Sequence, residues 1–140
     1  MTGHDGKNFP RPTRETLPFW EGCRSGELRL QHCGDCGRHQ FYPRLMCSHC
    51  NSEALAWVRA SGTGTVSSFT VVRRPVSQAY AAETPYIVAL IALAEGPTMM
   101  SNLVGCEPDD AAIGMAVEVV FEQWSQEITV PKFRPLHPRP

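Results

Sequence analysis

Apolar and polar residues alternate in short runs along most of the chain, and this pattern is typical of β-strands. The exception lies near the start, where residues 17–20 contain three apolar side chains. Thr16 before them is of a type that caps helices, and Gly26 after them is of a type that ends helices, so we expect a short helix between the two. From residue 64 on, the runs are rich in valine, threonine and phenylalanine. The expected strands cover residues 28–32, 40–43, 55–58, 65–73, 86–93, 98–104, 117–124 and 128–133.

The last five of these strands have the pattern of a small barrel. A turn or single helical turn at residues 107–110 separates the third of the five from the fourth. A five-stranded Greek-key barrel of the OB type has this strand count, and we interpret the interruption as its inserted helical segment. A small β-sandwich or an SH3-like barrel would fit the strand lengths almost as well.

Composition divides the chain into four segments. We expect a polar, flexible leader at residues 1–15 and a helix with a cysteine-rich ribbon at 16–60. The barrel follows at residues 61–135, and a proline-rich tail covers 136–140.

Four cysteines form two closely spaced pairs, C-x2-C-x10-C-x2-C, at Cys33, Cys36, Cys47 and Cys50. Two such pairs can direct four thiolates toward one point, and soft thiolates in tetrahedral geometry select zinc, with Zn–S distances of about 2.3 Å. The residue after each pair often needs a left-handed backbone. Gly37 and Asn51 stand there, and these are the residue types that tolerate that conformation best. The sequence therefore predicts a compact zinc ribbon.

Four thiolates leave no open coordination position for water, so we expect one structural zinc ion rather than a catalytic one. Iron in a rubredoxin-like centre is the chemical alternative. Cys23 and Cys106 stand alone in the sequence and are interpreted as small buried apolar residues. We interpret His32, His39 and His49 as residues of the ribbon surface that donate hydrogen bonds at most.

Charge and hydropathy exclude several classes of protein. The 140 residues include 13 basic and 14 acidic ones, for a formal net charge of −1, which argues against a non-specific nucleic-acid binder. The apolar stretch at 86–94 is far shorter than the roughly 20 residues of a membrane helix. The first residues have no apolar core of the kind that a secretory signal needs. We therefore expect a cytoplasmic protein without a membrane segment.

Few side chains suggest binding, and none forms a recognisable catalytic group. Phe19 and Trp20 are too apolar for a short free helix, so they pack either on the protein's own core or on a partner. Arg73 and Arg74 at a strand end, with Arg44 as a second position, are candidates for anion binding; solvated surface arginines are the alternative interpretation. No phosphate-binding glycine loop and no nucleophile motif occurs in the sequence.

The order of these motifs resembles one known family, the acyl-CoA-associated zinc-ribbon/OB-fold proteins, formerly a domain of unknown function. The resemblance covers residues 16–135. It rests on Phe19-Trp20-Glu21-Gly22, Gly26-Glu27-Leu28, the two cysteine pairs, Tyr42-Pro43-Arg44, Trp57-Val58, Ser61-Gly62-Thr63-Gly64-Thr65-Val66, Ser68 to Val72, Pro85-Tyr86, Glu95-Gly96, Ile113-Gly114-Met115 with Val117, and Val120-Phe121.

The resemblance implies a mainly β fold, with a short N-terminal helix, a rubredoxin-like zinc ribbon and a five-stranded OB barrel. It also implies a non-catalytic accessory subunit that binds a thiolase-fold enzyme and helps form its acyl-CoA site. Such enzymes are thiolases, acyl-CoA synthases and lipid-transfer-protein-like aldolases of steroid side-chain breakdown, and other family members pair with hydratases. By position, the four paired cysteines would hold zinc, and Phe19, Trp20 and Tyr42 would dock on the partner or line its channel.

Two other functions remain open at this point. Zinc ribbons and OB barrels both bind single-stranded nucleic acid, and Phe69 beside Arg73 and Arg74 could serve that purpose. The second alternative function is that of a carrier, which would bind a CoA thioester without a protein partner.

Overall fold

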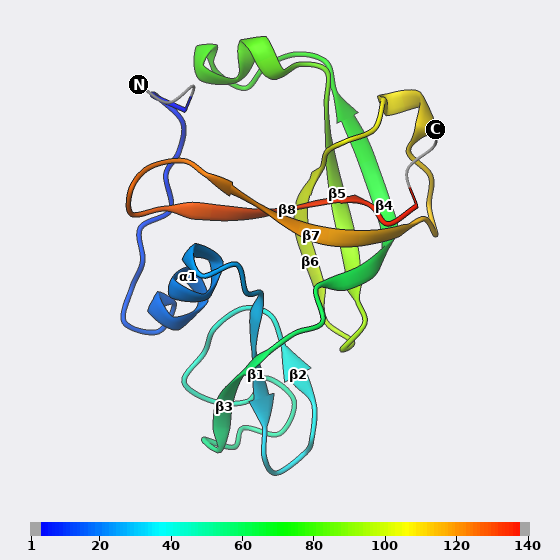
Figure 1. The fold of residues 1–140 in the computed structure, drawn as a ribbon. Coiled ribbons are helices and arrows are strands. Elements are labelled where there is room, and N and C mark those ends of the chain that lie inside the picture. The colour runs from blue at the N-terminus through cyan, green and yellow to red at the C-terminus, as the bar shows by residue number, and fades with distance from the viewer. Residues whose placement is uncertain (1–3, 138–140) are drawn as a thin grey trace.

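The computed structural model describes residues 4–137 and contains a helix, a small ribbon sheet and a closed barrel, one after another along the chain (Figure 1). Helix α1 covers Leu17–Arg24 and packs between the ribbon and the barrel. Thr16 precedes it but makes no capping bond from its side chain. Its hydroxyl instead accepts a hydrogen bond from the Thr13 backbone N–H at 2.8 Å. Gly26 ends the helical segment with φ of 76°, a conformation that favours glycine.

The ribbon is a three-stranded antiparallel sheet with the order β2-β1-β3 among the described residues. Strand β1 covers Arg29–Cys33, β2 covers His39–Gln40 and β3 covers Leu55–Arg59. The expected strand at 55–58 is β3, which pairs with β1 from Arg29↔Arg59 to Cys33↔Leu55 and so completes the ribbon sheet. Strand β2 ends before Pro43, which has no N–H to give to a sheet.

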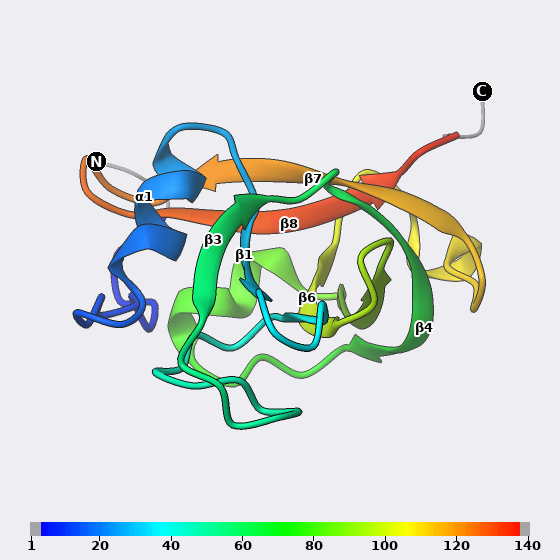
Figure 2. The same ribbon diagram turned by 90° about the horizontal axis from the view of Figure 1, so that it is seen from below.

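Within residues 4–137, five strands close into a barrel with the order β4-β5-β6-β8-β7 (Figure 2). The strands are β4 Thr63–Val72, β5 Tyr86–Leu93, β6 Thr98–Leu103, β7 Ala116–Gln123 and β8 Thr129–Pro135. Strands β6 and β8 are parallel at Leu103↔Phe133, and β4 closes the barrel on β7 at Gly64↔Val117. Two 3-10 helices, η1 Gln78–Glu83 and η2 Pro108–Asp110, lie in the connections after β4 and β6. This topology confirms the OB barrel over the sandwich and the SH3-like barrel.

Close approach of β4 and β5 depends on Gly64. A Cβ atom there would lie 2.5 Å from the carbonyl oxygen of Ala92 on β5, so a larger residue would separate the two strands. The position explains why the chain has a glycine inside a strand.

One apolar core joins all three parts. Phe19 and Cys23 from α1 and Leu28 and Leu30 from the ribbon lie in the same buried cluster as the barrel residues, with Phe133 at zero exposure. A second, smaller cluster forms around Trp124, Ile128 and Val130 at the β7–β8 turn. None of the helices within residues 4–137 is long and apolar enough to cross a membrane.

The described part of the expected leader lies against the barrel. Phe9 contacts Trp124 edge-on, with ring centroids 5.4 Å apart, and Lys7 is buried. Figure 1 shows this segment running past the β7–β8 turn toward η1. Residues 1–3 of the leader and 138–140 of the expected tail lie outside the described residues.

Candidate metal centre and binding pocket

The structure brings together the four paired cysteines. The Sγ atoms of Cys33 and Cys50 are 3.6 Å apart, as are those of Cys36 and Cys47, and all four lie within 4.8 Å of one another. Tetrahedral metal–sulfur bonds of about 2.3 Å separate neighbouring sulfurs by about 3.8 Å. The four thiolates therefore fit a single metal ion, and this ligand group contains no histidine or carboxylate among the described residues.

The backbone of the two turns supports this geometry. Gly37 and Asn51 have φ of 78° and 63°, as expected from their residue types. Each donates its N–H to the carbonyl of the first cysteine of its pair at 2.9 Å, which closes the turn. The Cys36 N–H points at the Cys33 sulfur at 3.4 Å, and this contact is the main reason that the pKa of Cys33 falls to about 6. The pKa of Cys47 is lowered as well, whereas burial and contacts with the other sulfurs raise the pKa values of Cys36 and Cys50. Thiolate is the form that binds metal, so a bound ion would draw the proton from these two thiols.

Two buried glutamines fix the loop between the cysteine pairs. Gln40 Nε2 donates to Gln31 Oε1 at 2.7 Å, and the Arg44 backbone N–H donates to the same oxygen at 2.9 Å. Gln31 Nε2 in turn donates to the Arg44 carbonyl at 2.9 Å, and Ser48 N–H donates to Gln40 Oε1 at 2.8 Å. This network ties the loop to β1 and β2. Nothing in the sequence pattern singled out Gln31 or Gln40, although each stands beside a residue that was interpreted as ribbon surface.

The remaining predicted contact residues do not form one site. Phe19 is buried between Trp20 and Phe41, with ring centroids 5.0 and 5.5 Å away, so it serves the protein's own core. Trp20 is half-buried and lines a shallow groove of about 250 Å³ with Phe41 and Met100.

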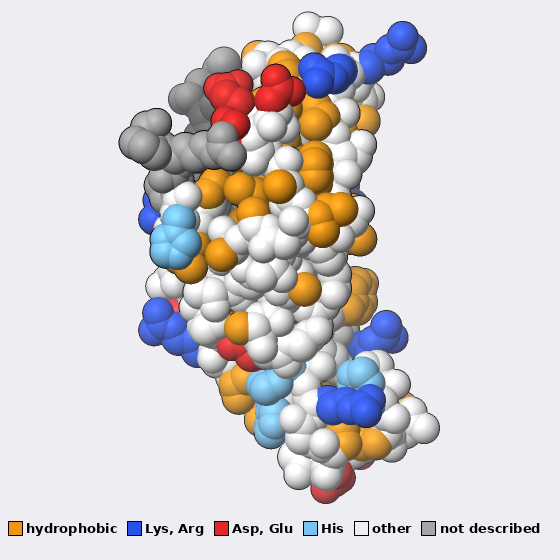
Figure 3. All heavy atoms as spheres, turned by 90° about the vertical axis from the view of Figure 1, so that its right-hand side faces the viewer, with side chains coloured by type: hydrophobic (Ala, Val, Ile, Leu, Met, Phe, Trp, Pro, Cys, Tyr) orange, Lys and Arg blue, Asp and Glu red, His pale blue; other side chains and the backbone are white. Residues whose placement is uncertain are grey.

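Tyr42 is 64% exposed on the ribbon loop, and the Arg44 guanidinium lies 5.6 Å from its ring centre. Leu45 and Met46 on the same loop are 74% and 45% exposed. At the ribbon end of the molecule, Figure 3 shows cationic and histidine side chains close to hydrophobic ones. Arg73 and Arg74 are exposed and directly follow β4, which ends at the side of the barrel away from the ribbon (Figure 1).

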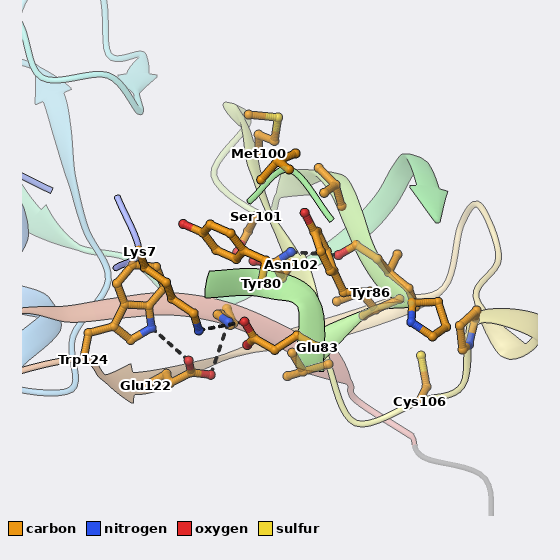
Figure 4. A pocket seen from close by; sticks show the side chains of 18 residues that line it. Lys7, Tyr80, Glu83, Tyr86, Met100, Ser101, Asn102, Cys106, Glu122 and Trp124 are labelled. Carbon is orange, nitrogen blue, oxygen red and sulfur yellow. Dashed lines mark hydrogen bonds and ion pairs between the residues drawn. The ribbon is translucent and has the colours of Figure 1, made fainter. Parts of the chain in front are cut away.

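A second candidate site is a pocket of about 630 Å³ beside η1, β5 and β6 (Figure 4). Strands β5 and β6 are the second and third of the barrel, and OB barrels bind ligands on that face and on the loops beside it. The sequence did not reveal the pocket because two of its walls come from segments without a strand pattern, the expected leader and the loop between the expected strands 65–73 and 86–93. The alanines at 79, 81 and 82 were a weak signal that the loop is helical.

Ion pairs occupy the charged end of this pocket. Lys7 Nζ lies 2.7 Å from a Glu83 oxygen, and Lys132 Nζ lies 3.3 Å from a Glu122 oxygen. The Trp124 indole N–H donates to Glu122 at 2.8 Å. Burial by itself would raise the pKa of Glu122, but the indole hydrogen bond and the Lys132 charge outweigh it and lower that pKa.

Comparison with known proteins gives consistent matches over nearly all of the chain. The family model described as "ChsH2, rubredoxin-like zinc ribbon domain" matches residues 20–56, and "ChsH2, C-terminal OB-fold domain" matches residues 57–122. A DUF35 domain-containing scaffold protein of Methanothermobacter thermautotrophicus is 34% identical over 115 residues, which cover 81% of this chain and 86% of that protein.

Two hydratase subunits are also similar. A probable enoyl-CoA hydratase alpha subunit of Thermomonospora curvata is 38% identical over 132 residues, and the matched region covers 93% of this chain and 41% of that protein. The 3-oxo-4,17-pregnadiene-20-carboxyl-CoA hydratase alpha subunit of Mycobacterium tuberculosis is 36% identical over 125 residues, which cover 86% of this chain and 39% of that protein. The chain thus spans well under half the length of both.

Among solved structures, a chain of the Ltp2-ChsH2(DUF35) aldolase superposes with a TM-score of 0.81 at 37% identity. The superposition covers 90% of this chain and 98% of that one. The whole of that chain therefore has a counterpart in the helix, ribbon and barrel described above.

Proposed function

Because the chain belongs to the ChsH2 (DUF35) family, we propose that it is a cytoplasmic, non-catalytic accessory subunit that binds a thiolase-fold enzyme and helps form its acyl-CoA site. The partner would be a thiolase, an acyl-CoA synthase or a lipid-transfer-protein-like aldolase that acts on a steroid side chain or another acyl group. The observation that carries the proposal is the 98% coverage of the ChsH2(DUF35) chain in an aldolase whose name pairs it with Ltp2.

The proposed metal is one structural zinc ion held by the four paired cysteines. Support comes from the sulfur separations of 3.6 Å and from the zinc-ribbon match at residues 20–56. Four thiolates complete a tetrahedral shell, so the ion would stabilise the ribbon and would not bind substrate. The iron alternative would give a coloured protein, whereas zinc is colourless.

The ribbon loop is the proposed docking surface. Tyr42, Leu45 and Met46 expose apolar side chains on a backbone that Gln31 and Gln40 already fix, so binding would order little additional chain. Trp20 in the adjoining groove would extend this surface, while Phe19 supports it from within the core. Arg44 on the ribbon loop, and separately Arg73 and Arg74 at the far end of the barrel, would contact the partner or acyl-CoA in the assembled enzyme.

The charge pattern of the barrel supports this proposal over single-strand nucleic-acid binding. A nucleic-acid groove needs cations that are available to phosphates. In the pocket beside β5 and β6, Lys7 of the N-terminal segment and Lys132 of β8 are each paired with a glutamate instead.

The test is affinity capture of the tagged chain from its source organism, with the retained proteins identified by mass. We expect one stoichiometric thiolase-like or aldolase-like partner. Its turnover of a CoA thioester should depend on added chain, and the chain alone should have none. Recovery of nucleic acid without a protein partner, or turnover by the chain alone, would refute the proposal.

A pair of variants tests the docking surface. Leu45→Asp should abolish capture of the partner, because it places a charge in an apolar interface. Ile113→Asp is the matched control, since Ile113 is 71% exposed and lies in the barrel segment after η2, outside the ribbon. If the two variants captured the partner equally well, the interface would lie outside the ribbon loop.

A further inference from the structure

The pocket beside η1 has the size and lining of a small-molecule site. Its volume of about 630 Å³ lies within the range of about 300–1,000 Å³ that such sites occupy. Tyr80 on η1 and Tyr86 on β5 face it with ring centroids 6.4 Å apart, and Figure 4 shows Trp124 on the other side of the polar cluster. Strands β5 and β6 form the floor, where Val88 contributes an aliphatic side chain.

The charges in the pocket cancel one another. Two lysines and two glutamates line it, and they form the pairs Lys7–Glu83 and Lys132–Glu122. An anionic ligand would find its cations already paired and two carboxylates nearby, and a cationic ligand would meet two ammonium groups. An uncharged ligand can bind without breaking either ion pair.

The N-terminal segment His4 to Phe9, here called the strap, holds the charged end of the pocket together. The Lys7 side chain is 1% exposed, and its ammonium lies 5.5 Å from the Tyr80 ring centre and 5.0 Å from that of Trp124. The Asn8 backbone N–H donates to the Tyr80 hydroxyl at 3.2 Å. The strap thereby joins η1 to the β7–β8 turn, the two loops that border the OB ligand face.

We propose that this pocket binds an uncharged ligand built mainly of apolar rings, and that the strap forms one of its walls. The two polar side chains on its floor each donate to the barrel backbone, Ser101 to Pro131 at 2.9 Å and Asn102 to Ile87 at 3.0 Å. These two side chains make part of the floor polar, which suits a small polar substituent on the ligand, but they supply no charge. The site lies within this single chain, so it does not depend on the accessory role.

The experiment compares two fluorescent probes with the same ring skeleton, neutral N-phenylnaphthylamine and its sulfonated analogue anilinonaphthalene sulfonate. The full chain should bind the neutral probe more tightly, because the sulfonate would meet no available cation in the pocket. Glu83→Gln leaves Lys7 without its carboxylate, so this variant should bind the sulfonate several-fold more tightly than the parent does. If the parent prefers the sulfonate, or Glu83→Gln changes nothing, the charge argument is wrong.

Two further variants locate the probe. Val88→Trp fills the pocket from its floor and should weaken binding of the neutral probe about tenfold. Ile113→Trp adds the same ring at an exposed position outside the pocket and should leave binding unchanged. Tyr80→Ala removes a wall and serves as a second test if Val88→Trp does not fold. The proposal would be overturned if Val88→Trp, or Tyr80→Ala in its place, bound the neutral probe as tightly as Ile113→Trp does.

Competition separates two sources of the ligand, a free molecule and the acyl group of a thioester. Methyl naphthoate should displace the neutral probe, and failure to do so would contradict the assignment of an uncharged ring ligand. Displacement by naphthoyl-CoA as well would identify the site as an acyl pocket with its mouth open to CoA. Displacement by the ester alone would identify a site for a free small molecule.

Discussion

The turns after the two cysteine pairs need a left-handed backbone at Gly37 and Asn51, whereas Gln31 and Lys7 are buried through contacts with residues far away in the chain. Gly37 and Asn51 could be predicted because a left-handed backbone is a local property, and few residue types adopt it. The cysteine spacing was equally informative, since two residues between ligands is a local constraint. Gln31 and Lys7 could not be predicted in this way. A polar residue becomes buried only when distant groups supply its hydrogen bonds, here Arg44 and Glu83.

The left-handed backbone at Gly37 predicts a cost for alanine without any steric clash. A Cβ atom at Gly37 would meet nothing within 4 Å, so Gly37→Ala should lose only the conformational term, about 1 kcal/mol of unfolding free energy. Gly34→Ala is the matched control, because its Cβ would make an ordinary contact of 3.5 Å with the Ala54 oxygen and Gly34 does not have a positive φ. Urea denaturation of both variants measures the difference. Equal stability of the two would contradict the assigned backbone role.

The lowered pKa of Glu122 predicts a stability change in acid. A carboxyl whose pKa is lowered by folding stabilises the protein above its ordinary value of 4.5, and that contribution disappears as the pH falls through the lower folded value. Glu122→Gln should therefore be less stable than the parent at neutral pH, and the difference should shrink as the pH falls below 4.5 and through the lower folded pKa. Thermal melts from neutral to acid pH test this, with exposed Glu127→Gln as control. A constant gap between Glu122→Gln and the parent at all pH values would argue against it.

Strands and helices were predicted more reliably than the contacts between them. Strand β5 begins and ends where its apolar run does, because an unbroken apolar run between turn residues is typical of a strand whose two faces are both largely covered. Strand β3 was predicted as a strand, but its pairing with β1 was not, since that pairing is set by the distant Cys33↔Leu55 register. The strap has no periodic pattern at all. Its position depends on the buried Lys7, on the contacts of His4 and Phe9 with Trp124, and on the hydrogen bond from Asn8 to Tyr80.

The buried position of Lys7 in the strap predicts that this side chain stabilises the fold, although its neighbours in the sequence are polar. Lys7→Ala should lower the unfolding free energy by about 1–3 kcal/mol, because it removes a charged contact of 2.7 Å and leaves Trp124 and Tyr80 without the ammonium between them. Amide hydrogen exchange in η1 should rise at the same time. Asp5→Ala, an exposed change in the same segment, should do neither. Unchanged exchange in η1 for Lys7→Ala would show that the strap does not hold it.

The molecule as a whole combines a metal site with an apolar core that crosses from ribbon to barrel. Leu28 and Leu30 of the ribbon and Phe19 of α1 belong to the same buried cluster as Val66 and Phe133 of the barrel. Small ribbons bury too little apolar surface to fold alone, and a closed metal site supplies the missing free energy. The metal should therefore act beyond its own ligands, through the side chains that the ribbon contributes to the barrel.

Cys36→Ser tests this coupling, because serine keeps the side-chain size and removes one thiolate. The variant should lose its metal and the exchange protection of β1 and β3, since three remaining thiolates hold zinc far less tightly. Protection of β5 should fall as well, because unfolding of the ribbon exposes the core side of Ile91 and Val66. Cys106→Ser, half-buried and outside the thiolate cluster, is the control for a lost sulfur. Metal content and hydrogen exchange, measured on the same samples, separate the outcomes. Retained metal would refute the ligand assignment, whereas lost metal with unchanged β5 protection would mean that the barrel is stable without the ribbon.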